Sequence, residues 1–172
     1  MSNNLLIIIL GILANSAGIA FNFYYLNIIG GILILIGLIR TKLTGNLIKK
    51  TRNTAIASIP FAILSVIIDI FGKNTSDGAS IALGINIFFY IYVTYYFTEA
   101  LIASAKDVNE LAATRGFRGT WTLCGIIAFM YFMTFSALVP SVVMIIKIVM
   151  MIAAIYYCST INASSKLLFK NN

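Results

Sequence analysis

Residues 40–53 read RTKLTGNLIKKTRN, a polar connection that contains basic residues and no acidic one. It follows the stretch 5–39, which carries no charge at all, and it precedes the apolar stretch 54–71. Lysine and arginine gather in the cytoplasmic loops of membrane proteins. The pattern therefore predicts a membrane protein in which this connection forms a basic face in the cytoplasm. The basic residues of that face are Arg40, Lys42, Lys49, Lys50 and Arg52.

Composition indicates the same class of protein. The chain has 172 residues, of which 60% are hydrophobic and 10% are charged, whereas soluble domains carry about 25% charged residues. We expect one transmembrane domain over 1–172, with no separate soluble catalytic domain. The excess of 12 Lys and Arg over 5 Asp and Glu fits basic cytoplasmic loops, so the expected partner is the lipid bilayer and not nucleic acid.

The hydropathy pattern predicts an all-α integral membrane protein, a compact bundle of six transmembrane helices. A hydrocarbon core of about 30 Å needs about 20 helical residues. Several segments are shorter, so tilted helices or a locally thinned bilayer are expected. The first segment lacks the basic residues that open a signal peptide, and we expect it to be a span. The predicted spans are 5–21, 23–39, 54–71, 79–103, 120–138 and 140–159.

The uncharged stretch 5–39 allows one long bent helix or two helices joined by a tight turn near Asn22 to Asn27. One helix over this stretch would be about 52 Å long, too long for a bilayer without a large protrusion. We therefore expect the hairpin. Small residues such as Gly11, Gly18 and Gly30 predict that its two helices pack closely.

Charge distribution sets the expected orientation. With six spans, the basic stretches 40–53 and 104–118 and the carboxyl-terminal tail all fall on one side, while the opposite connections are short and nearly neutral. The positive-inside rule places the basic side in the cytoplasm. Both termini are therefore expected in the cytoplasm, in a bacterial plasma membrane.

A weak parallel internal repeat is visible when LIRTKLTGNLIKKTR (38–52) is laid over LIASAKDVNELAATR (101–115). Both stretches connect spans on the same side, as a parallel repeat requires. Chance explains five identities in a chosen window equally well. After the second stretch, Gly116 and Gly119 are expected to break the helix before Trp121 opens the fifth span.

Three ionisable residues fall within the predicted spans: Asp69, Glu99 and Lys147. A charge within the bilayer is a functional candidate because insertion costs about 2.5 to 3.5 kcal/mol. Lys147 and Asp69 both lie toward the outer side and lean toward each other, whereas Glu99 lies near the inner end. Lys147 then has three alternatives: a pair with Asp69, contact with an anionic ligand, or snorkelling to the outer headgroups.

The fourth span contains an aromatic stretch, NIFFYIYVTYYFTEALI (86–102). At helical spacing Phe89, Tyr92, Tyr96 and Glu99 share one face. If this face lines a cavity, its rings, hydroxyls and single acid suit a flat or cationic solute. Ordinary core packing is the alternative. Asn86, near the outer face, is a further candidate ligand group.

Several kinds of chemistry are disfavoured. The chain has no histidine and only two cysteines, in different apolar segments. This excludes the usual Ser-His hydrolases and argues against a transition-metal site, which usually needs three or four Cys, His or carboxylate ligands. No glycine-rich phosphate loop is present. We therefore expect no metal, no cofactor and no catalytic residues, and we favour a protein that is not an enzyme.

A membrane enzyme stays an alternative only because Tyr, Lys and Glu can do acid and base chemistry. Two other functional hypotheses are favoured over it. The first is a transport component or a membrane-embedded small-molecule-binding subunit, working with other membrane subunits or a second copy of itself. In size and topology alone, this bundle resembles the substrate-binding subunits of energy-coupling-factor vitamin transporters, although no motif of that family is present. The second is a structural or accessory membrane protein without its own ligand, such as an assembly factor, an immunity protein or a regulator of a larger complex.

Overall fold

The computed structural model describes residues 2–41, 45–71, 76–107, 110–134 and 140–168. These residues form six α-helices, and no strand occurs among them. The all-α prediction is confirmed for this part of the chain. The helices are α1 (Ser2–Phe21), α2 (Tyr25–Arg40), α3 (Asn46–Phe71), α4 (Ser76–Asp107), α5 (Leu111–Thr134) and α6 (Pro140–Leu168).

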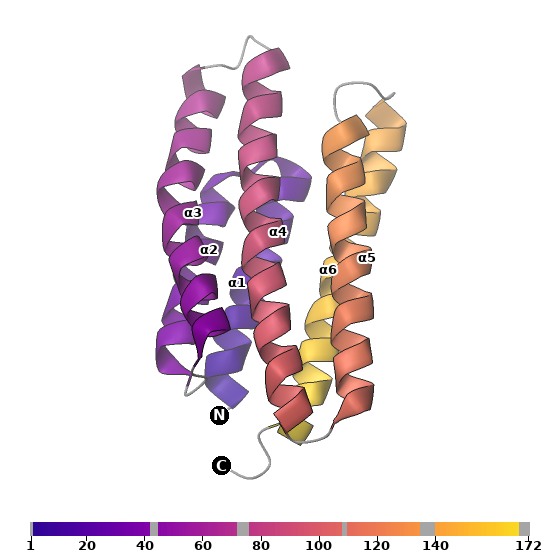
Figure 1. The fold of residues 1–172 in the computed structure, drawn as a ribbon. Coiled ribbons are helices and arrows are strands. Elements are labelled where there is room, and N and C mark those ends of the chain that lie inside the picture. Colours follow the sequence, from indigo (N-terminus) through magenta and orange to yellow (C-terminus); the bar gives the residue numbers. More distant parts are fainter. Residues whose placement is uncertain (1, 42–44, 72–75, 108–109, 135–139, 169–172) are drawn as a thin grey trace.

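The helices run up and down beside one another and close into a ring. Each helix packs on the next in the sequence, α6 returns to pack on α1, and α1 also contacts α4 across the ring. Figure 1 shows the beginning of α1 and the end of α6 at the same end of the bundle, together with the last turns of α2 and α4. The basic stretches of the sequence therefore gather at the end that holds the termini.

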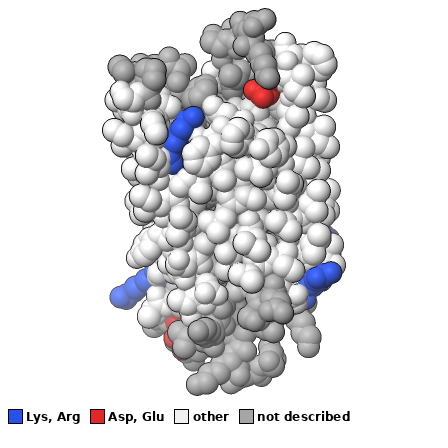
Figure 2. All heavy atoms as spheres, turned by 180° about the vertical axis from the view of Figure 1, so that it is seen from behind, with Lys and Arg blue, Asp and Glu red and all other residues white. Residues whose placement is uncertain are grey.

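Apolar side chains occupy both the interior and the outer surface of the bundle. The largest fully buried side chains include Phe97, Tyr131 and Tyr157. Large exposed hydrophobic side chains are present on all six helices, which is the arrangement expected of a bundle whose solvent is lipid. On the face shown in Figure 2, the charged side chains lie toward the two ends, and a broad uncharged band separates them. Exposed examples, one from each helix in order, are Leu6, Ile39, Ile70, Phe88, Ile126 and Ile145.

Four helices are long and apolar enough to cross a membrane. They contain the segments Asn4–Phe21, Asn46–Phe71, Ser80–Asp107 and Ser141–Ser164. Helix α2 is apolar but has only 16 residues, which gives a length of about 24 Å. Helix α5 has 24 residues, and its first two turns carry Arg115 and Arg118.

The predicted turn between the first two helices is confirmed. Helix α1 ends at Phe21 and α2 begins at Tyr25. Between them, Asn22 has a φ of 58°, in the left-handed region that asparagine tolerates better than most residues. The close approach of the two helices is also confirmed: a Cβ added to Gly11 would lie 2.7 Å from the backbone oxygen of Gly30.

Helix boundaries differ from the predicted spans at several ends. Helix α3 begins at Asn46 rather than 54, α5 at Leu111 rather than 120, and α6 continues to Leu168 rather than 159. The apolar pattern marks the part of a helix that faces hydrocarbon, whereas backbone hydrogen bonding continues into the polar flanks. Lys49, Lys50 and Arg52 consequently lie on a helix and not in a loop.

The expected break at Gly116 and Gly119 was wrong, because α5 runs through both glycines. A glycine inside a helix costs only about 1 kcal/mol relative to alanine. Buried Ala113 and Phe117 anchor this part of the helix to the core. The weak internal repeat stays a prediction, since residues 42–44 and 108–109 of its two stretches lie outside the described residues.

Candidate functional site

The α1–α2 hairpin carries the same short pattern on both helices, an asparagine followed three residues later by a glycine. On α1 these are Asn15 and Gly18, and on α2 they are Asn27 and Gly30. Each asparagine side chain lies against the glycine of the other helix, so a methyl group on Gly18 would collide with Asn27 Oδ1 and one on Gly30 with Asn15 Oδ1. The glycines therefore make the space in which the two amides lie.

Both amides border a small cavity between the α1–α2 hairpin and the α3–α4 hairpin. The cavity has a volume of about 10 Å³, enough for about one water-sized group. Its walls are neutral, since the only group in them that titrates is the phenol of Tyr90. The lining residues are Asn15 and Asn27 from the first hairpin, Ser58 and Ala62 from α3, and Asn86, Phe89, Tyr90 and Val93 from α4.

Two of the three amides have polar atoms without a hydrogen-bond partner among the described residues. Asn15 is 7% exposed and Asn27 is 5% exposed, and the unpartnered atoms are Asn15 Oδ1, Asn27 Oδ1 and Asn27 Nδ2. An unsatisfied buried polar group costs about 1 to 3 kcal/mol. Asn86, by contrast, donates from Nδ2 to the carbonyl of Ala82 at 2.7 Å. The residues that line the cavity thus include two acceptor atoms and one donor atom without a partner among the described residues.

A buried polar stripe on α4 continues away from this cavity. Asn86, Tyr90, Thr94 and Thr98 recur at every fourth residue, and all four are buried. The hydroxyl of Tyr90 receives a hydrogen bond from Ser16 Oγ at 3.1 Å and lies 2.9 Å from Cys124 Sγ. The stripe connects α4 to α1, α5 and α6.

The part of the stripe formed by Thr94 and Thr98 is hydrogen-bonded to α5 and α6. Trp121 Nε1 donates to Thr94 Oγ1 at 3.1 Å. The hydroxyls of Thr98 and Tyr157 lie 2.6 Å apart, and the Tyr157 hydroxyl is 3.4 Å from the carbonyl of Thr94. These contacts tie helices together, whereas the unpartnered amides of the cavity do not.

Thr98→Val is expected to destabilise the bundle by about 1 to 2 kcal/mol, because the shape is kept while Tyr157 loses its short hydrogen bond in a buried position. Thr122→Val is the matched control, since Thr122 is exposed and its hydroxyl donates to the carbonyl of Arg118 within its own helix. Unfolding in mixed micelles of increasing SDS fraction measures both. Equal losses in the two variants would show that the Tyr157 contact carries no stability.

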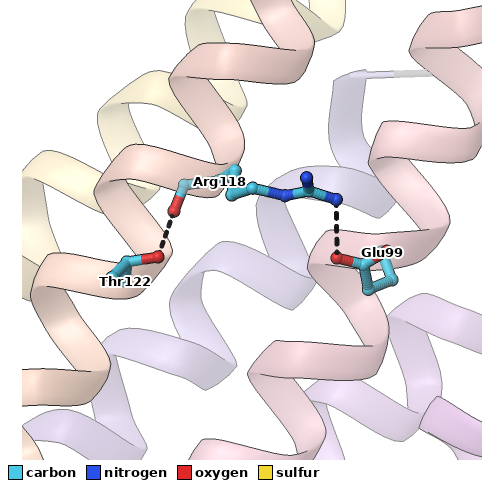
Figure 3. Close-up of polar contacts among 3 residues, drawn as sticks. All are labelled: Glu99, Arg118 and Thr122. Carbon is cyan, nitrogen blue, oxygen red and sulfur yellow. Dashed lines mark hydrogen bonds and ion pairs between the residues drawn. The ribbon is translucent and has the colours of Figure 1, made fainter.

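The aromatic stripe predicted on α4 does not lie together on a cavity wall. Among its members only Phe89 borders the polar cavity. Tyr92 is 41% exposed on the outer surface, and Tyr96 lies beneath the ammonium of Lys50, 5.7 Å from the ring centroid. Glu99 Oε1 pairs with Arg118 Nη2 at 3.5 Å, as Figure 3 shows. The buried rings of α4 include Tyr90 and Phe97, and neither belongs to the predicted stripe.

Lys147 lies over an aromatic ring and not beside Asp69. Its ammonium is 6.0 Å from the ring centroid of Tyr131, whose hydroxyl donates to Asn22 Oδ1 at 3.4 Å. Among the described residues no ion pair within 4.0 Å joins Lys147 to Asp69. Asp69 instead lies near Tyr24, at the α1–α2 turn.

The structure describes four of the five residues of the predicted basic face, and Lys42 lies outside the described residues. Arg40, Lys49, Lys50 and Arg52 are all exposed. Lys49 and Arg52 border an open hollow of about 310 Å³ next to the end of α2. Lys50 points to a different side, toward α4.

Metal binding finds no support in the described part of the chain, where no group of three or more Cys, Asp or Glu could hold an ion. Comparison with family models, curated proteins and solved structures finds no match to this chain. The site itself therefore carries the functional inference.

Proposed function

We propose that this protein is a membrane-embedded small-molecule-binding subunit or transport component, and that its ligand binds at the amides of Asn15 and Asn27. The observation that carries the proposal is that these two buried residues line a cavity and carry polar atoms that no described residue satisfies. Proteins retain such groups at a cost in stability where they serve binding.

The chemistry of the cavity restricts the class of ligand. The lining residues include no carboxylate and no basic side chain, so a charged ligand would lose its hydration without a counter-charge. Two acceptors and one donor match a small neutral molecule that both donates and accepts hydrogen bonds. A molecule larger than water requires the α1–α2 and α3–α4 hairpins to separate, because the cavity has a volume of about 10 Å³.

The proposed setting is a bilayer crossed by all six helices, with both termini in the cytoplasm of a bacterial cell. The four long apolar helices and the basic end of the bundle support this arrangement. Helix α2 is short for a full crossing, and tilting or local thinning accommodates it. The sequence has no nucleotide-binding loop, so active transport would draw its energy from partner subunits.

Asn15→Ala and Asn27→Ala are each expected to abolish retention of the ligand, because each removes an amide from the cavity wall. Native mass spectrometry of protein purified gently from its own membranes measures the bound mass. Asn53→Ala is the matched control, since Asn53 is exposed on α3, and it should retain the ligand as the wild type does.

The same spectra distinguish the competing function. A small mass present in the wild type and the Asn53→Ala protein but absent from both cavity variants supports the proposal. Co-purified protein subunits without any small ligand would overturn it and favour the structural or accessory role. The Lys147→Ala protein tests the other candidate ligand group, and it should keep the ligand because Lys147 does not line the cavity.

A further inference from the structure

The outward side of α4 carries a continuous row of aromatic rings between α3 and α5. Phe88 and Tyr92 have ring centroids 4.5 Å apart, and those of Tyr92 and Tyr96 are 6.2 Å apart. Tyr95 then contacts Tyr96 at 5.4 Å and Trp121 at 5.2 Å. We call these five residues the aromatic face. Its rings are partly or largely exposed and do not belong to the polar cavity.

Two cations and one carboxylate lie at the end of the aromatic face nearest the termini. Lys50 of α3 is exposed and lies over Tyr96, and it has no carboxylate within 4.0 Å among the described residues. Arg118 of α5 is 61% exposed and makes one contact of 3.5 Å with Glu99. Figure 3 shows the guanidinium of Arg118 reaching from α5 toward Glu99 on α4. The cluster therefore has a net charge of +1.

The position of this charged cluster along the bundle axis matches the headgroup level of a bilayer. Glu99 lies eight residues before Asp107, the last residue of α4, a rise of about 12 Å. Tyrosine and tryptophan favour the headgroup level, where one part of the ring is in hydrocarbon and the other is wet. Tyr92 lies about 10 Å deeper than Glu99, at the depth of acyl chains.

We infer that the aromatic face binds one anionic phospholipid, whose phosphate contacts Lys50 and Arg118 and whose acyl chain lies along Tyr92 and Phe88. Charge decides the headgroup, since a net charge of +1 complements a lipid with a single negative charge. Arg118 has five N–H donors, and one contact to Glu99 leaves donors for a phosphate. This inference requires the bilayer setting but does not depend on ligand binding at Asn15 and Asn27.

Glu99 allows a prediction that a general basic surface would not allow, namely the direction in which lipid affinity changes when its carboxylate is neutralised. Its carboxylate holds the guanidinium of Arg118 in place and also repels a phosphate, so its neutralisation strengthens the binding of an anionic lipid. A zwitterionic lipid with an ammonium group would respond in the opposite way, because the ammonium would lose Glu99 as its partner. Glu99→Gln thus distinguishes the two headgroups.

The fluorescence of Trp121 can be used to test the inference, because Trp121 is the one tryptophan of the sequence and belongs to the aromatic face. The protein is reconstituted into phosphatidylcholine vesicles that contain phosphatidylglycerol or phosphatidylethanolamine, with one lipid class brominated on its acyl chains. Quenching of Trp121 fluorescence reports the lipid beside it. We expect phosphatidylglycerol to be preferred over phosphatidylcholine, and the preference to fall about fivefold for Lys50→Gln and again for Arg118→Gln.

Lys49→Gln is the matched control, since it removes the same charge from the neighbouring residue, which borders a different hollow. It should leave the preference unchanged, and Glu99→Gln should raise it severalfold. Equal affinities of the wild type for phosphatidylglycerol and phosphatidylcholine would overturn the inference. So would a loss of this preference in Lys49→Gln as large as the loss in Lys50→Gln. A fall in phosphatidylethanolamine binding in Glu99→Gln, without a gain for phosphatidylglycerol, would assign the site to a zwitterionic lipid instead.

Discussion

Gly30→Ala is expected to destabilise the bundle by about 3 kcal/mol, at the upper end of the usual cost of overpacking. The added methyl group would lie 2.6 Å from the backbone oxygen of Gly11 and would also collide with Asn15 Oδ1. A backbone oxygen cannot rotate away as a side chain can, so α1 and α2 must separate. Unfolding in mixed micelles of increasing SDS fraction, followed by near-ultraviolet circular dichroism, measures the loss.

Gly18→Ala provides the comparison that identifies the cause. At Gly18 the closest obstacles belong to the Asn27 side chain, and the nearest backbone atom, the carbonyl oxygen of Phe23, lies at 3.1 Å. Asn27→Ala should therefore restore most of the stability that Gly18→Ala removes. Asn15→Ala should not restore Gly30→Ala, because the contact with Gly11 remains. Equal rescue of the two glycine variants would show that the asparagines alone set the distance between these helices.

The helical segments could be predicted from the sequence because the connections on one side are strongly basic and those on the other side are short. The uncharged stretch 5–39 was too long for one span, and the turn predicted within it is present at Asn22. The ends of the helices were less accurate. Hydropathy changes where a helix leaves hydrocarbon, but the helix itself continues, as α3 does through Lys50 and Arg52.

The interior of the site was harder to predict because lipid tails are as apolar as a protein core. Hydropathy therefore cannot tell which face of α4 is buried. The stripe through Phe89 and Tyr92 and the stripe through Asn86 and Tyr90 both satisfy helical spacing, and the ionisable Glu99 favoured the wrong one. Polar residues at every fourth position of an otherwise apolar helix were the signal for the buried face.

In the sequence, Asn15 and Asn27 carry a weaker signal than the charged residues, because an amide within a membrane helix often serves only to join helices. Charge is visible in a sequence, whereas the absence of a hydrogen-bond partner is a property of the packed structure. The repeated spacing of asparagine and glycine, Asn15 with Gly18 and Asn27 with Gly30, was the available clue. It indicates an amide packed against a glycine of the other helix only once the hairpin has brought α1 and α2 together.

Replacing Asn15 and Asn27 together by leucine is expected to raise the stability of the ligand-free protein by about 2 kcal/mol or more. Leucine has a similar branched shape, and the substitution removes three buried polar atoms that no described residue satisfies. For a chain of this size the melting temperature should rise by about 4 to 8 °C. Thermal unfolding in detergent measures it. Asn53→Leu controls for the higher helix propensity of leucine, since Asn53 is exposed on α3.

The direction of this change separates the two functional readings. A more stable double variant that no longer retains a ligand means that the amides are kept for binding, at a cost in stability. A less stable one means that the amides join helices, and that reading belongs to a structural or accessory protein. A stability equal to that of the Asn53→Leu control would point to a single bridging water, for which the cavity of about 10 Å³ has room. Only the first outcome agrees with the function proposed for this protein.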